Sequence, residues 1–139
     1  MGEFKRDLTH WLLRLSPDEW IRAALAELNK AEQAWQRGDA RAAIAGMKRA
    51  AGMALNGALV VEPTDAWGRT YVEHLKALAV DGGVPEAVRL ASRQVLEAEG
   101  PSGLVVLRTP HAREAALEAT RDVIAHAWTV VKRHESAQG

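Results

Sequence analysis

The segment at residues 42–58 restricts the possible folds of this chain more than any other part of the sequence. It consists almost entirely of Ala, Gly, Met and Leu, and Lys48, Arg49 and Asn56 are its only strongly polar members. Small residues that would let neighbouring backbones approach closely recur along it, at Gly46, Ala50, Gly52 and Gly57. A helix that is apolar on nearly every side belongs at the centre of its fold. We therefore expect a central helix here, surrounded by other helices.

Start and stop signals define this helix and the one before it. The Ser-Pro-Asp-Glu sequence at 16–19 combines an N-cap serine, a proline at the first helical position and a glutamate placed to close a capping box. The apolar stripe that follows predicts a helix ending near Gln36. Gly38 suits the left-handed turn after it. Asp39 can then cap the central helix, which should run to about Leu59.

Three further helices are expected along the rest of the chain. Thr64 or Asp65 can cap a shorter helix that runs through Val80. A second short helix should begin at Pro85, and the last helix should occupy roughly residues 111–134. The sequence therefore predicts an all-α, up-and-down bundle of four or five helices.

The expected bundle is a single domain from residue 16 to residue 134. Residues 1–15 contain a short amphipathic stretch, which we interpret as a short helix or a strap. An apolar run within residues 102–110 is too short for a helix and predicts an extended connector laid on the core. Residues 135–139 are predicted to be a disordered tail.

Composition excludes several classes of function. The 139 residues contain 18 basic and 18 acidic side chains, so no net field attracts the whole molecule to nucleic acid or to an anionic membrane. The absence of cysteine excludes disulfides and thiol catalysis, and it favours a cytoplasmic protein. No apolar run has the roughly 18 residues of a membrane span, and the first residues lack a signal-peptide pattern. The sequence contains no grouping of histidines and acids typical of a metal site and no cofactor-binding motif, so neither a metal nor a cofactor is expected.

One motif on the last predicted helix suggests chemistry. Arg121 is followed directly by Asp122, and His126 comes after four intervening residues. Together with the alanine-rich hairpin before it, this helix resembles the HEPN family of small bacterial helical bundles, over about residues 20–133. That family carries an Arg, four to six residues and a His, usually on its last helix. Catalytic members cleave RNA without metal, at a site where two such motifs meet across a homodimer.

The resemblance implies a role for each residue of the motif. His126 would handle the proton of the 2′-hydroxyl or of the leaving oxygen, because imidazole titrates near neutral pH. Arg121 would hold the scissile phosphate, since a guanidinium binds phosphate oxygens in a bidentate fork. Asp122 would orient one of the two.

Helix geometry sets a condition on this site. Five positions on a regular helix separate Arg121 and His126 by about 140° around the axis. The two side chains therefore cannot meet on one phosphate within a straight helix of one chain, and a dimer partner or a helix distortion is required. The same spacing also occurs at Arg69 and His74, so spacing alone does not identify a site.

Simpler interpretations of the three residues stay open. His126 can be a histidine at the edge of the core with its tip in water. Arg121 can stack on the indole of Trp128. Asp122 can be an ordinary solvated residue.

Two functions of different classes follow. The first is a HEPN-like bundle that acts as a homodimeric or partner-binding module without catalysis, which docks on a nucleotidyltransferase-type protein or binds a nucleotide. The alternative is a metal-independent HEPN-type ribonuclease, a toxin or defence component, with a composite active site across the dimer. The neutral net charge favours the first.

Overall fold

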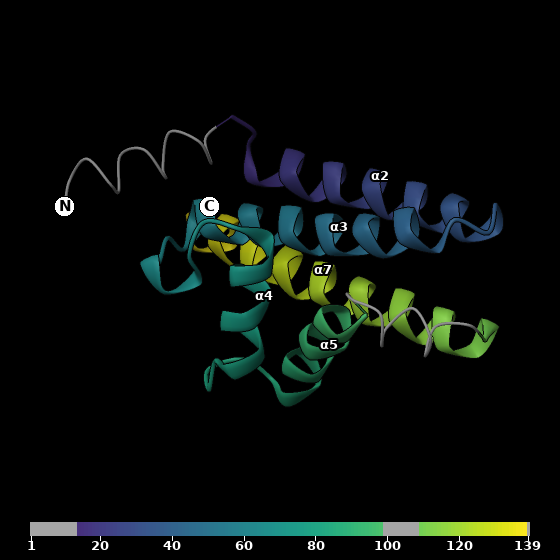
Figure 1. Ribbon diagram of the computed structural model, residues 1–139. Helices are drawn as coiled ribbons and strands as arrows, with labels where there is room; N and C mark the ends of the chain where they lie inside the picture. The colour runs from purple at the N-terminus through teal and green to yellow at the C-terminus, as the bar shows by residue number, and fades with distance from the viewer. Residues whose placement is uncertain (1–13, 99–108, 139) are drawn as a thin grey trace.

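The computed structural model describes residues 14–98 and 109–138, and every regular element in these ranges is helical (Figure 1). The elements in chain order are α2 (Pro17–Gln36), α3 (Ala40–Val61), the short 3₁₀ helix η1 (Asp65–Trp67), α4 (Tyr71–Val80), α5 (Glu86–Glu97) and α7 (Pro110–Gln138). The predicted all-α bundle with three long and two short helices is confirmed.

Local signals place the ends of α2 and α3 where the sequence predicted them. The hydroxyl of Ser16 accepts a hydrogen bond from the backbone N–H of Glu19 (3.1 Å), and the Glu19 carboxylate accepts one from the N–H of Ser16 (2.9 Å). Gly38 takes a left-handed conformation with φ of 80° and ends the hairpin turn. Asp39 caps α3 by accepting a hydrogen bond from the N–H of Ala42 at 3.1 Å.

Helix α3 is the central element of the fold. It lies between α2 and α7 in Figure 1 and packs against both of them and against α4. Most of its residues are buried, including Gly46, Gly52 and Gly57. A Cβ atom at Gly46 would lie 3.0 Å from the Cβ of Ala31 on α2, so glycine permits the close approach of these two helices. The central position predicted for residues 42–58 is confirmed.

Ion pairs between helices define the direction of each long helix. Asp18 near the start of α2 pairs with Lys132 late in α7 at 3.5 Å, and Glu32 near the end of α2 pairs with Arg121 at 2.9 Å. Helices α2 and α7 are therefore antiparallel. Glu62, just after α3, binds the C-terminal part of α7, so α3 and α7 run in the same direction. The chain passes through α4 and α5 between these two parallel helices (Figure 1).

The predicted helix from Thr64 or Asp65 to Val80 is wrong at its start. Residues 65–67 form only the 3₁₀ turn η1, and Gly68 then breaks it with φ of 67°. Helix α4 begins after Thr70, whose hydroxyl accepts a hydrogen bond from the N–H of Glu73, while the Glu73 carboxylate accepts one from the N–H of Thr70. This capping box starts the helix six residues later than a cap at Thr64 would.

The last helix is longer than predicted. Thr109 caps it through the N–H of Ala112, and α7 continues to Gln138, so the predicted disordered tail from residue 135 is helical as far as Gln138. Lys132 and Glu135 are paired one turn apart at 2.9 Å, and no proline or glycine interrupts the helix here. The predicted strap at residues 1–15 and the connector at 102–110 lie almost wholly outside the described residues.

Candidate functional site

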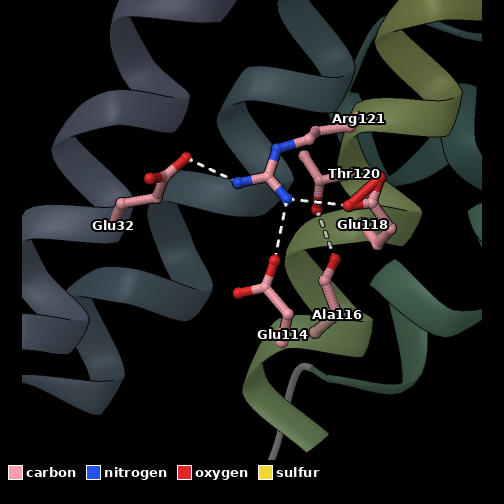
Figure 2. Close-up of polar contacts among 6 residues, drawn as sticks. All are labelled: Glu32, Glu114, Ala116, Glu118, Thr120 and Arg121. Atoms are coloured by element: carbon pink, nitrogen blue, oxygen red, sulfur yellow. Dashed lines mark hydrogen bonds and ion pairs between the residues drawn. The ribbon is translucent and has the colours of Figure 1, made fainter. Parts of the chain in front are cut away.

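Arg121 on α7 lies among three carboxylates (Figure 2). Its Nη1 donates to Glu114 at 3.2 Å and to Glu118 at 2.9 Å, both one or two turns earlier on α7. Its Nη2 donates to Glu32 of α2 at 2.9 Å. The side chain is 34 % exposed, so this cluster lies at the surface of the α2–α7 contact.

The electrostatics of this cluster do not favour a phosphate. Partial burial opposes the charge of Arg121, but hydrogen bonds to Glu114, Glu32 and Glu118 outweigh it and raise the pKa of the guanidinium. Three carboxylates against one guanidinium leave a formal charge of −2. Both terminal nitrogens already have anionic partners, so an incoming phosphate meets net repulsion and has to displace them.

His126 is on a different side of α7 from Arg121. It lines a cleft of about 610 Å³ between the segment after α3, the turn between α4 and α5, and α7, whereas Arg121 faces α2 and does not border the cleft. The separation expected from helix geometry is therefore present, and one chain does not bring the two side chains together. Asp122 is exposed and forms no hydrogen bond or ion pair with either of them. The cation over the ring of Trp128 is Lys132, at 5.1 Å, and not Arg121.

Charged groups surround His126 in the cleft. The carboxylate of Glu62 accepts hydrogen bonds from Arg133 at 3.0 Å and from His134 at 2.8 Å. Partial burial alone would raise the pKa of Glu62, but these two hydrogen bonds outweigh it and lower the pKa. Burial is the main cause that lowers the pKa of His126, and Arg133 adds to it, while Asp81 and Glu62 act in the opposite direction. The imidazole of His126 is therefore neutral at pH 7.

A buried polar network holds one wall of the cleft. Trp67 lines the cleft, and its carbonyl oxygen lies 2.7 Å from Nδ1 of His74. The other ring nitrogen of His74 lies 3.0 Å from Oδ1 of Asn56 on α3. His74 and Asn56 are both fully buried. This hydrogen-bonded pair was not predicted from the sequence. One signal was present, because a polar residue inside an apolar helix, such as Asn56, usually has a buried hydrogen-bond partner.

A second surface feature lies between α2 and α7. Leu25 on α2 and Trp128 on α7 are large apolar side chains that are 50 % and 47 % exposed. The antiparallel register set by the Asp18–Lys132 and Glu32–Arg121 pairs places them between these two pairs, in neighbouring positions. We call Leu25, Trp128 and the two flanking ion pairs the α2–α7 strip.

The described residues contain no group of three or more His, Cys, Asp or Glu side chains that could hold a metal ion. No helix in the described ranges has the length and apolar character needed to span a bilayer.

A scan against protein-family models and searches of curated proteins and of solved structures gave no match to this chain. The resemblance to the HEPN family therefore stays a prediction from the residues of α2, α3 and α7.

Proposed function

We propose that the chain is a non-catalytic helical-bundle module that acts by pairing with a second copy of itself through the α2–α7 strip. The observation that carries this proposal is the neighbouring exposure of Leu25 and Trp128 on two adjacent helices. Tryptophan is among the residues that contribute most to protein interfaces, because it buries a large rigid surface. Leu25 and Trp128, with an ion pair on either side of them, resemble the apolar centre and polar rim of a protein–protein interface.

Charge along the strip supports a second copy as the occupant. At the end near Glu32, three carboxylates surround Arg121. The end near Asp18 has two carboxylates, Asp18 and Glu135, beside Lys132, and it also presents the exposed Arg22. A two-fold axis near Trp128 would lay the acidic end of one copy against the basic side chains of its partner. Homodimer formation is also what the HEPN resemblance implies, and the lack of cysteine supports a cytoplasmic setting.

The ribonuclease alternative has less support. It requires Arg121 to bind a scissile phosphate, and the neighbouring carboxylates of Glu32, Glu114 and Glu118 oppose this. Pairing of two copies through the α2–α7 strip would not bring His126 to Arg121, because His126 lines a cleft on a different side of α7. A nucleotidyltransferase-type partner on the strip is the occupant to consider if the chain does not pair with itself.

The test is the oligomeric state of the full chain and of two matched variants, measured by sedimentation equilibrium. Leu25→Glu places a charge in the strip, and Leu90→Glu places the same charge at a leucine of similar exposure (48 %) on α5. We expect a dimer for the parent chain and for Leu90→Glu, and at least about tenfold weaker pairing for Leu25→Glu. A monomeric parent chain, or equal effects of both variants, contradicts self-association through this strip.

A further inference from the structure

We propose that the cleft beside His126 binds a small organic cation, a planar amidinium or a protonated amine attached to an apolar or aromatic body. This site is separate from the α2–α7 strip and does not depend on pairing of two copies. Its volume of about 610 Å³ lies within the range of small-molecule sites in proteins.

The walls of the cleft provide an apolar surface for the body of the ligand. Val84 and Val130 contribute buried aliphatic side chains, and Trp67 contributes a half-buried indole. The backbone of Trp67 is held in place by a hydrogen bond between its carbonyl oxygen and the buried ring of His74. An indole face attracts cations as well as flat aromatic groups.

Both carboxylates of the cleft retain an oxygen that accepts no hydrogen bond from a described residue. Asp81 accepts one hydrogen bond, at Oδ1 from the N–H of Gly83 (2.9 Å), which leaves its other oxygen for a ligand. Glu62 binds Arg133 and His134 through Oε2 and retains Oε1. A ligand with several N–H donors satisfies these oxygens, whereas a ligand with oxygens of its own does not.

The charge balance of the cleft also selects a cation. Asp81 and Glu62 are the carboxylates of the lining, and Arg133 is its one permanently charged base. Arg133 already donates to Glu62 at 3.0 Å, so this carboxylate offsets the positive charge that an anion would meet. The remaining base, His126, is neutral at pH 7 because burial lowers its pKa. The net negative lining disfavours phosphate and carboxylate ligands.

His126 supplies the specific contact. It is half-buried and makes no hydrogen bond with any described residue, so both nitrogens of its imidazole can reach a ligand. As a neutral ring it offers one donor and one acceptor. The acceptor nitrogen adds to the oxygens of Asp81 and Glu62 around an amidinium group.

Three probes of similar shape and different charge test this proposal: benzamidine, benzamide and benzoate. Titration of the ¹⁵N-labelled full chain, followed by NMR at the indole N–H of Trp67, gives the affinity of each. We expect benzamidine to shift this signal in a saturable way, benzamide to bind at least about tenfold more weakly, and benzoate to have no effect. Saturable binding of benzoate, or no binding of benzamidine, overturns the proposal.

Variants at the carboxylates locate the bound cation. Asp81→Asn keeps the oxygen that accepts from Gly83, so the turn is preserved while the charge is removed. Glu62→Gln serves as a second variant, and Glu97→Gln is the control at an exposed carboxylate of α5 outside the cleft. We expect about tenfold weaker benzamidine binding in Asp81→Asn and no change in Glu97→Gln. Equal affinities in all three variants would place benzamidine elsewhere and overturn the proposal.

Discussion

At the scale of single residues, His74 and Asn56 show how a buried polar pair restricts protonation. Burial is the main cause that lowers the pKa of His74, so the ring is neutral at pH 7 and donates Nδ1–H to the Trp67 carbonyl. The unprotonated Nε2 then needs a donor. With Oδ1 of Asn56 facing the ring, Nε2 has no donor and the Nδ2 group of Asn56 has no partner. If the amide is turned so that Nδ2 faces the ring, Nδ2 donates to Nε2 and both groups are satisfied.

This arrangement predicts a loss of stability in acid. The pKa of His74 is lowered in the folded state, so below pH 6.5 the histidine is protonated more readily in the unfolded chain than in the folded chain. The contribution of the neutral ring is complete above pH 6.5, the ordinary value for histidine, and is lost as the pH falls below it. We expect the free energy of unfolding in urea to fall by up to about 1.4 kcal/mol for each pH unit lost below that point.

The variant His74→Gln isolates this effect. Glutamine does not titrate, so the pH dependence between 7.5 and 5 should become shallower than in the parent chain, whatever the variant does to overall stability. The pKa of His126 is also lowered, so the variant His126→Gln measures how much of the pH dependence comes from that histidine instead. An unchanged slope in His74→Gln would show that His74 is not the group responsible.

At the scale of elements, the contact between α3 and α4 depends on a glycine. A Cβ at Gly52 would lie 2.3 Å from Cδ1 and from Cγ of Tyr71, the first residue of α4. These atoms are at the base of the ring and cannot move away without moving α4. The absence of a side chain at Gly52 is therefore what allows Tyr71 to lie against α3.

Gly52→Ala should accordingly destabilise the protein even though alanine favours helix. Overpacking costs about 1–3 kcal/mol, and the gain in helix propensity offsets about 1 kcal/mol of it. The added Cβ overlaps several atoms of Tyr71, so we expect a net loss near the upper end, about 2 kcal/mol in the free energy of unfolding in urea. Gly82→Ala is the control, because no atom lies within 4 Å of its added Cβ. A Gly52→Ala protein as stable as this control would disprove the close contact.

The same elements show what the sequence predicts and what it does not. Local chemistry was sufficient for α2 and α3, because the capping box at Ser16 and the turn at Gly38 act within a few residues. It misplaced the start of α4, where Thr64 and Thr70 both offer a cap and the choice depends on Gly68 and Glu73. The sequence pattern alone does not show which of the two threonines caps the helix.

The candidate sites depend on contacts between distant segments. Arg121 is bound by Glu32, 89 residues earlier, and no local pattern indicates that pair. The cleft takes its lining from the segment after α3, the α4–α5 turn and α7, which only the fold brings together. The 140° separation of Arg121 and His126 was predictable, because it depends on helix geometry alone.

At the scale of the whole molecule, charge and geometry together argue against RNA cleavage. The chain has no net charge, the guanidinium of Arg121 is held by three carboxylates, and His126 faces a cleft with a negative lining. A nuclease needs cationic groups that converge on a phosphate beside its general base.

We therefore expect no cleavage of mixed RNA by the purified chain in EDTA, read on a denaturing gel beside a metal-independent ribonuclease as positive control. The variant His126→Ala should be indistinguishable from the parent chain. Cleavage by the parent chain that is lost in His126→Ala would instead establish a composite site, because Arg121 of the same chain does not reach this histidine. The lowered pKa of His126 would then identify it as a general base that is unprotonated at neutral pH.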